Sequence, residues 1–337
     1  MISIKHILCP TDLSPHSGNA MRYALALSRV YQAKLIFLYC EAGSSISNTQ
    51  HTLTIAQAEA LESLLFEHID PANLVDLHWQ CLVHVGTDDI GEEITKQAQE
   101  TNADFIVMRS RRRPRRAALL GSTAESVCRS APCPVLVMHD EERESITADL
   151  QVDLKRVLVA YDFSEYSELA FKYGLSLAQQ HQADLHLLHV LPPHSVNEPE
   201  IAWYPNKGES AYHLAATRLQ RAIPAEAHLW CNVKTVVREG HPYREILNYA
   251  EENEIDLISV GAHGAGFGMR ALFGSNVDRV LRQAPCPVLV ARHLRPACAD
   301  RTQISLRAKR ESEMDCAGET YATGGKNTHG ISRRIPC

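Results

Sequence analysis

Glycines and a serine in the second half of the chain have the spacing of an anion-binding site. Residues 261–264 read Gly-Ala-His-Gly, nine residues follow, and Gly274-Ser275 comes next. Glycine lets the backbone approach a ligand closely and adopt positive φ without a Cβ penalty. Where Gly274-Ser275 opens a helix, the free amides and the helix dipole favour an anion. The pattern therefore indicates a phosphate site, and a glycine-rich turn that only links a strand to a helix is the alternative.

A carboxylate in the same half could complete this site. Asp162 follows an apolar run and precedes Phe163-Ser164. If its strand and the strand before the glycines are neighbours in a parallel sheet, Asp162 lies across the crevice from the glycine loop. There it would accept hydrogen bonds from a base amino group or a ribose hydroxyl while the amides hold phosphates. A turn or helix-capping role for Asp162 is the alternative interpretation.

The first half of the chain repeats these landmarks. Residues 131–137 (APCPVLV) return unchanged as residues 284–290, and residues 7–14 return in altered form as residues 157–164. A period of roughly 150 residues indicates a domain duplication, because solenoid units repeat every ~20–50 residues.

The loop chemistry differs between the two halves. The first half keeps Asp12 and Gly121-Ser122 but has Arg109 and Arg112 in place of the first two glycines. Long side chains there would fill the space of the phosphates, so this half is predicted not to bind a phosphate-bearing ligand in the same manner. The arginine-rich stretch, residues 109–116, could instead hold phosphates by side chain, bind an acidic partner or nucleic acid, or be a solvated loop without a ligand. Nucleic acid is disfavoured, because the net charge is −6 and no aromatic residues accompany the arginines.

Composition limits the remaining classes of protein. The 337 residues are 45% hydrophobic and 22% charged, which suits two globular domains. We expect no signal peptide, and no apolar run reaches the ~18 residues of a membrane span. The ten cysteines contain no Cys-x-x-Cys pair, so we interpret them as reduced thiols of a cytoplasmic protein. His186 and His189 face opposite ways on a predicted strand, which disfavours a metal site.

Each half alternates β-branched runs with amphipathic helical patterns, as in a parallel sheet with crossover helices. Strands are predicted at residues 6–9, 35–39, 76–85, 104–108, 135–138, 156–161, 185–190, 229–237, 257–260 and 288–291. Helices are predicted at residues 14–30, 55–68, 90–99, 122–129, 164–181, 210–223, 242–251 and 276–282. The halves define domains at 1–139 and 154–293, joined by a polar, acidic linker at 140–153 that is expected to be exposed. Residues 294–337 lack periodicity and are predicted to be disordered.

Together these motifs resemble the universal stress protein A family. The resemblance rests on Gly-x-x-Gly-x9-Gly-Ser after a strand, Asp-x-Ser after the first strand, and the Pro-Cys-Pro-Val-Leu-Val that closes each half, and it covers residues 1–293. It implies an α/β fold of two tandem doubly wound domains, each a five-stranded parallel sheet of order 3-2-1-4-5 flanked by helices. It also implies ATP, with Mg²⁺, bound in the second domain. The residues that the resemblance places around the nucleotide are Ala160, Asp162, Val190, Val260, Gly261, Gly264, Gly274, Ser275 and Asn276.

Two functions stay open at this point: an ATP-binding stress-response regulator with little or no hydrolysis, and an ATP-using enzyme such as a slow ATPase or a transferase. The second half has no P-loop lysine to neutralise a transferring phosphate. His263 is the one acid–base candidate near the phosphates, and a loop histidine without a catalytic task is preferred, so no catalytic residue is assigned. The regulator implies a protein partner that the sequence does not identify.

The last strand of each half, at residues 135–138 and 288–291, is apolar and suited to edge pairing. In the resembling family two subunits meet through this strand. Here the two copies could pair within one chain as a pseudo-dimer, and a homodimer is the alternative.

Overall fold

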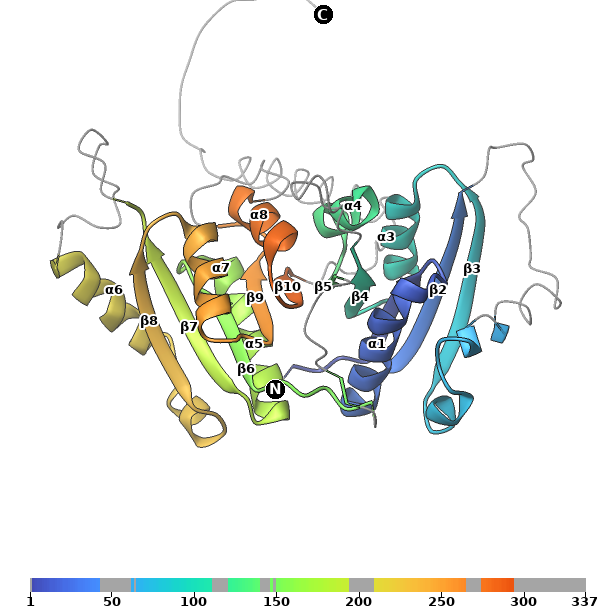
Figure 1. Ribbon diagram of the computed structural model, residues 1–337, viewed down its shortest axis with the longest axis horizontal. Coiled ribbons are helices and arrows are strands. Elements are labelled where there is room, and N and C mark those ends of the chain that lie inside the picture. The colour runs from blue at the N-terminus through green and yellow to red at the C-terminus, as the bar shows by residue number, and fades with distance from the viewer. Residues whose placement is uncertain are drawn as a thin grey trace, which may run out of the picture. The chain divides into compact units, whose positions relative to one another are not determined.

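Two matching series of strands and helices build the two halves of the chain (Figure 1). The computed structural model describes residues 2–42, 62–63, 65–110, 121–139, 146–147, 150–193, 209–264 and 274–293. The first half contains β1 (His6–Thr11), α1 (Gly18–Tyr31), β2 (Lys34–Ala42), β3 (Trp79–Thr87), α3 (Ile90–Glu100), β4 (Phe105–Arg109), α4 (Ser122–Ser130) and β5 (Val135–Met138). The second contains β6 (Arg156–Ala160), α5 (Glu165–His181), β7 (Asp184–Leu191), α6 (Glu209–Arg221), β8 (Val233–Glu239), α7 (Pro242–Glu252), β9 (Leu257–Gly261), α8 (Ser275–Gln283) and β10 (Val288–Ala291).

The strand order within each half is 3-2-1-4-5, and each half's strands are parallel, which confirms the predicted doubly wound domains. In the first half Ile7 of β1 pairs with Leu35 of β2 on one side and with Phe105 of β4 on the other. The chain therefore reverses its winding direction between β1 and β4, and likewise between β6 and β9. Loops at the carboxyl ends of these strands diverge there, and such switch points are where open α/β sheets bind ligands.

The two sheets join through their fifth strands. β5 and β10 pair antiparallel, with Val137 opposite Val288 and Val135 opposite Val290, so that the described strands form one ten-stranded sheet. The predicted pairing of the two copies within one chain is found. It removes the apolar edges that each half would expose alone.

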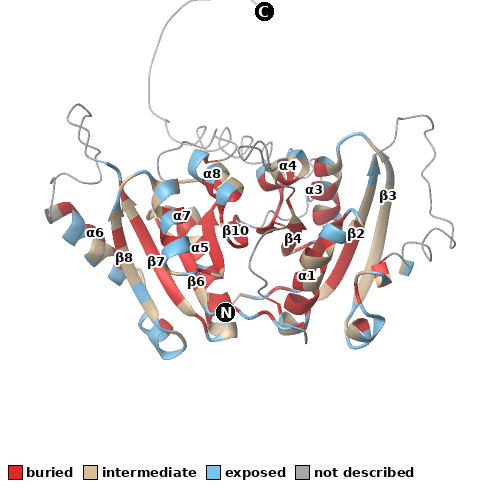
Figure 2. Cartoon of the chain, in the orientation of Figure 1, coloured by how far each residue is buried: buried red, intermediate tan, exposed pale blue. Residues whose placement is uncertain are grey.

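Strand alternation divides the core between the two faces of the sheet. Ile7 and Cys9 pack into one cluster with α1 and α5, whereas Leu8 packs into the other with α3, α4, α7 and α8. Figure 2 shows the inner strands red along much of their length, whereas at the edges β3 is tan and β8 is mostly tan and pale blue. Both clusters contain side chains from both halves, because the joined sheet continues each face across β5 and β10.

The third strand of each half begins later in the chain than the sequence predicted. The structure places short 3-10 helices at Pro71–Leu74 and Ala225–Leu229, and the strands start only at Trp79 and Val233. The first 3-10 helix is capped by Asp70, whose Oδ1 accepts the Ala72 N–H at 2.9 Å. Pro71, which follows this cap, has a φ suited to a turn. The pattern of alternating hydrophobicity does not reveal such a turn. Most of the helix predicted at 55–68 and all of the tail at 294–337 lie outside the described residues.

The prediction of an exposed linker is wrong for part of it. Ile146, Leu150 and Val152 are each less than a tenth exposed and pack into the core cluster that contains α1 and α5. Ile146 and Val152 also form an antiparallel bridge. The burial of these apolar residues could not be predicted, because their neighbours are charged and the linker has no helix or strand period that would show which side chains share a face.

No helix in the described part of the chain is long and apolar enough to cross a membrane. The seven cysteines described are all free thiols. Burial raises the pKa of Cys9 and Cys128 to about 12, so these thiols carry almost no thiolate at neutral pH.

The buried His186 and His189 and the partly buried His181 lead us to predict a pH dependence of stability. Burial lowers the pKa of His181, His186 and His189 below its ordinary value, so the unfolded chain binds protons that the folded chain does not. The free energy of unfolding should therefore fall as the pH drops below about 6.5, where unfolded histidine becomes charged. Urea unfolding at pH 7.5 and 5.5 measures this slope. A His186→Asn, His189→Asn double variant should flatten it, and an unchanged slope would contradict the assignment.

Candidate functional site

Asp162 lies just beyond the end of β6, at the point where β6 and β9 run side by side. Its Oδ1 accepts hydrogen bonds from the Ser164 N–H at 3.1 Å and from the Ser164 hydroxyl at 2.5 Å. Between them Phe163 has a φ of 64°, in the left-handed region. These two bonds form a side-chain turn of the kind that aspartate favours. The turn role weighed for Asp162 is therefore present, and it uses Oδ1.

The other oxygen of Asp162 faces the glycine loop. A Cβ on Gly264 would lie 2.8 Å from Asp162 Oδ2, closer than side-chain atoms normally approach. The carboxylate and the bare backbone of the loop thus come together across the switch point, as the sequence predicted. A side chain at position 264 would have to displace this carboxylate.

Gly261 is needed for packing. A Cβ there would lie 2.6 Å from the backbone carbonyl carbon of Tyr166, in the first turn of α5. The Tyr166 ring also packs edge-on against His263, with 4.8 Å between the ring centroids. Tyr166 is not among the site residues predicted from the sequence, although its place two residues after the helix cap Ser164 puts it at the same end of the sheet.

Helix α8 begins beside this loop without a side-chain cap. Gly274 is its N-cap, no side chain hydrogen-bonds there, and the Gly274 N–H donates to the Ala262 carbonyl at 3.3 Å. Ser275 and Asn276 in the first turn are exposed. Asp278 in the same turn is engaged by Arg282 through hydrogen bonds of 2.9 and 2.6 Å, which compensates its negative charge. The helix N-terminus is left suited to an anion.

The remaining predicted residues lie at neighbouring strand ends. Ala160 ends β6, Val190 lies near the end of β7, and Val260 is a buried residue of β9. All three pack against the core cluster of α7 and α8. Residues 265–273, between Gly264 and Gly274, lie outside the described residues.

Aromatic packing supports the turn that carries Asp162. The Phe163 ring contacts the His189 ring, with 4.7 Å between the ring centroids, and the Arg218 guanidinium, 4.0 Å from the Phe163 centroid. His189 Nδ1 lies 2.7 Å from the Tyr161 carbonyl oxygen, and burial lowers the pKa of this histidine. A neutral His189 with its proton on Nδ1 donates to that carbonyl, which holds the chain on both sides of Asp162.

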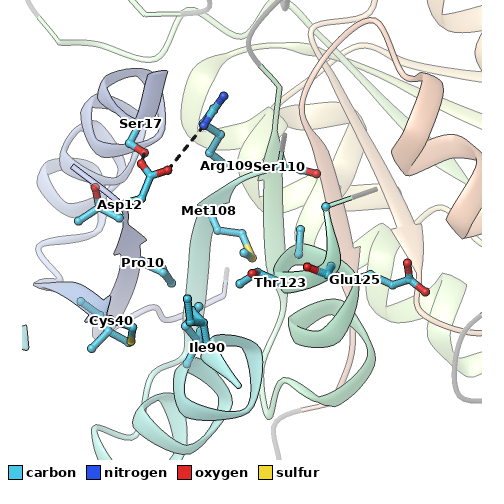
Figure 3. A pocket seen from close by; sticks show the side chains of 16 residues that line it. Pro10, Asp12, Ser17, Cys40, Ile90, Met108, Arg109, Ser110, Thr123 and Glu125 are labelled. Carbon is cyan, nitrogen blue, oxygen red and sulfur yellow. Dashed lines mark hydrogen bonds and ion pairs between the residues drawn. The ribbon is translucent and has the colours of Figure 1, made fainter. Parts of the chain in front are cut away.

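The first domain shows how the fold gathers the equivalent positions around one cavity. This cavity, of about 520 Å³, is bordered by the ends of β1 and β4 and the start of α4 (Figure 3). Its lining includes the counterparts of eight of the nine predicted site residues: Pro10, Asp12, Cys40, Met108, Arg109, Gly121, Ser122 and Thr123. The counterpart of Gly264 is Arg112, which lies outside the described residues, as does the rest of the 111–116 arginine stretch.

Arg109 changes the electrostatics of this first-domain cavity. Its Nη1 lies 3.9 Å from Asp12 Oδ2, and its side chain is only 11% exposed (Figure 3). Asp12 Oδ1 also accepts hydrogen bonds from the hydroxyls of Ser14, at 2.6 Å, and Ser17. The carboxylate that corresponds to Asp162 is therefore already paired with a cation.

No group of three or more histidine, cysteine, aspartate and glutamate side chains in the described ranges is placed to hold a metal ion.

Comparisons with known proteins identify the family. The sequence profile of the Universal stress protein family matches residues 3–139 and 153–292. A universal stress protein of Mycobacterium tuberculosis is 35% identical over 178 residues, which cover 52% of this chain and only 56% of that relative. A universal stress protein of Mycolicibacterium smegmatis is 26% identical over 294 residues, covering 85% of this chain and 96% of the relative.

Solved structures show the same fold. The crystal structure of a universal stress protein from Archaeoglobus fulgidus has a TM-score of 0.61 at 24% identity, and the match covers 86% of this chain and 99% of that one. The family profile matches both halves of this chain and leaves out little besides the linker and the tail. The chain therefore belongs to the Universal stress protein family, as a tandem two-domain member.

Proposed function

We propose that this protein is a cytoplasmic stress-response regulator that binds an adenine nucleotide, ATP with Mg²⁺, in its C-terminal domain (residues 154–293). The observation that carries the proposal is the approach of the Gly264 backbone to the Asp162 carboxylate, where a Cβ would lie 2.8 Å from Oδ2. A bare loop facing an acceptor at a switch point suits a ligand with donors at one end and an anion at the other. An adenosine phosphate has both.

Each part of the site then has a role. Asp162 Oδ2 would accept a hydrogen bond from the base or ribose, and Ala160 and Val190 would contact the adenosine. The backbone of the glycine loop and the first amides of α8 would hold the phosphates. Mg²⁺ would accompany the phosphates, since the described residues offer no carboxylate cluster for it.

Hydrolysis is proposed to be slow or absent, and the bound nucleotide would set the choice of a protein partner. His263, the acid–base candidate of the loop, packs against the Tyr166 ring, which suits a structural role. Turnover at about 1 s⁻¹ or faster would instead favour an ATP-using enzyme.

The direct test is the nucleotide content of the full chain purified without added nucleotide. We expect about one adenine nucleotide per chain after denaturation and chromatography, or stoichiometric ATP binding by calorimetry if the nucleotide is lost. A site that stays empty at millimolar adenylates (about 1–5 mM) would overturn the proposal, because a site with a Kd of about 100 μM or lower would be nearly saturated there.

Substitutions of Asp162 distinguish the roles of its two carboxylate oxygens. Asp162→Asn keeps an acceptor for the Ser164 turn but can turn an amide toward the ligand, and we expect about tenfold weaker ATP binding from the loss of one charged hydrogen bond. Asp162→Ala should weaken binding at least as much. The matched control is Asp12→Asn in the first domain, which should leave ATP affinity unchanged within about twofold. Equal effects of the two substitutions would contradict a C-terminal site.

A further inference from the structure

Two arginines and a tyrosine meet on the surface where α7 and α8 lie side by side (Figure 1). The Arg244 Nε donates a hydrogen bond to the Tyr243 hydroxyl at 2.8 Å, which lowers the pKa of that hydroxyl below its ordinary value. The Arg279 guanidinium, from the neighbouring helix, lies over the Tyr243 ring at 4.5 Å from its centroid. The tyrosine therefore holds two guanidinium groups close to each other.

Their positive charges are not compensated by neighbouring acids. No carboxylate in the described part of the chain forms an ion pair with either arginine. The acids next to them in sequence are engaged elsewhere, since Glu245 lies 3.6 Å from Arg238, and Asp278 lies 2.6 Å from Arg282. Both arginines are also exposed. Like charges this close repel each other, and an anion that reaches both would relieve the repulsion.

The first half of the chain lacks this pair of cations. The second and third residues of α3 are Gly91 and Glu92, where α7 carries the tyrosine and the first arginine. The fifth residue of α4 is Ser126, where α8 carries Arg279. A Cβ on Gly91 would lie 2.5 Å from the Ser126 Cβ, so α3 approaches α4 too closely for a larger side chain there. The cationic pair thus belongs to the half that keeps the glycine loop.

Both arginines lie at the edge of the sheet where the nucleotide site is proposed. Helix α7 follows β8 and helix α8 follows β9, so both helices begin beyond the carboxyl ends of these strands. Helical side chains point toward the N-terminus of their helix, so Arg279 reaches back over the first turn of α8. In the first half Ile90 and Glu125, the residues just before Gly91 and Ser126, line the cavity at this edge (Figure 3). The arginines therefore occupy positions beside the equivalent space of the second half.

We infer, on the basis of the proposed nucleotide site, that Arg244 and Arg279 bind the outer phosphates of the nucleotide and make the C-terminal domain favour ATP over AMP. The glycine loop and the first amides of α8 hold the inner phosphate. Each guanidinium has several N–H donors, which suit the phosphate oxygens farther along. Tyr243 is a positioning residue that keeps the two guanidiniums together. AMP has a single phosphate and does not extend to them.

The test is calorimetric titration of ATP and of AMP, each with Mg²⁺, into the full chain and into Arg279→Met. Methionine keeps an aliphatic stem beside the Tyr243 ring and removes the charge. We expect ATP affinity to fall about tenfold, because charge-assisted hydrogen bonds to a phosphate are lost. AMP affinity should change by less than about twofold, since AMP makes no such bond. Arg244→Met should lower ATP affinity in the same selective way.

Tyr243→Leu tests the positioning role without changing the charge. We expect ATP affinity to fall about threefold, because the ring that holds the Arg279 guanidinium is lost. AMP affinity should stay the same, so the ratio of the two affinities separates positioning of the arginines from a general disturbance of the fold. Equal weakening of both nucleotides would contradict the positioning role.

The matched control for charge is Arg221→Met, at the opposite edge of the sheet. Arg221 is exposed and lies in the last turn of α6, the helix that leads to the start of β8. Its loss should leave the affinity for ATP and for AMP unchanged within about twofold, because solvent and salt screen a charge at that distance. Circular dichroism of each variant confirms that the fold is kept.

Three results would each overturn the inference. These are ATP affinity in Arg279→Met within about twofold of the unsubstituted chain, equal weakening of ATP and AMP in that variant, and an equal loss of ATP affinity in Arg221→Met. In all three the unsubstituted chain still binds ATP, and the proposed function stands. A chain that binds neither nucleotide would overturn the proposed function, and the role of the arginines with it.

Discussion

Gly264→Val is expected to reduce ATP affinity at least about 100-fold, the largest effect on binding that the structure predicts. The valine Cβ would start 2.8 Å from Asp162 Oδ2, and its methyl groups would extend into the space between the loop and the carboxylate. The substitution therefore removes the space for the ligand and moves the acceptor at once. Calorimetric titration of ATP into the variant, with circular dichroism to confirm folding, measures the loss.

A double-mutant cycle shows whether the two groups act on one ligand. Gly264→Ala displaces the Asp162 carboxylate, so combining it with Asp162→Ala should cost less than the sum of the two single changes. The control is Gly18→Ala, because a Cβ on Gly18 would meet no atom within 4 Å. Strict additivity of Gly264→Ala and Asp162→Ala, or an equal loss from Gly18→Ala, would refute a shared site.

Arg292→Met is expected to lower the free energy of unfolding by about 3 kcal/mol, because it leaves buried carbonyl groups unpaired. Arg292 follows β10, is 5% exposed, and reaches into the first half of the chain. Its guanidinium donates to the Ala131 carbonyl at 2.9 Å and to the Arg129 carbonyl at 3.1 Å, at the end of α4. The loss should appear as a lower midpoint in urea unfolding.

The matched control is Arg129→Met. The Arg129 side chain is 40% exposed and pairs with Glu125 within α4, so its loss should cost at most about 1 kcal/mol. Equal midpoints for the two variants would show that the Arg292 contacts do not stabilise the chain.

The equivalent position in the first half makes the reciprocal contact. His139 follows β5, is 1% exposed, and its Nε2 lies 2.6 Å from the Leu281 carbonyl oxygen of α8. Each of the helices α4 and α8 is thus held at its C-terminal part by a residue of the other half. The sequence does not suggest this exchange, because histidine and arginine at matching positions share no motif.

In the candidate site, too, some features could be predicted from the sequence and others could not. Glycine spacing and the Asp-x-Ser motif predicted that Asp162 and Gly264 would face each other, and the pairing of β6 with β9 brings them together. The same spacing could not reveal that Gly261 is required by the Tyr166 backbone of α5. The first is a matter of strand order, and the second depends on how closely a helix lies on its sheet.

The duplication, the order of strands and helices, and the strand ends at which the candidate site lies could all be predicted from the amino-acid sequence. These follow from periodicity and short motifs, because a residue's neighbours along the chain decide which local structure it adopts. The pairing of Arg109 with Asp12, the burial of the Ser110 hydroxyl with no hydrogen-bond partner among the described residues, and the packing of Ile146 into the core became visible in the folded chain. Such contacts join residues up to 174 positions apart, as between Ile2 and Ser176, and depend on side-chain packing that local sequence does not encode.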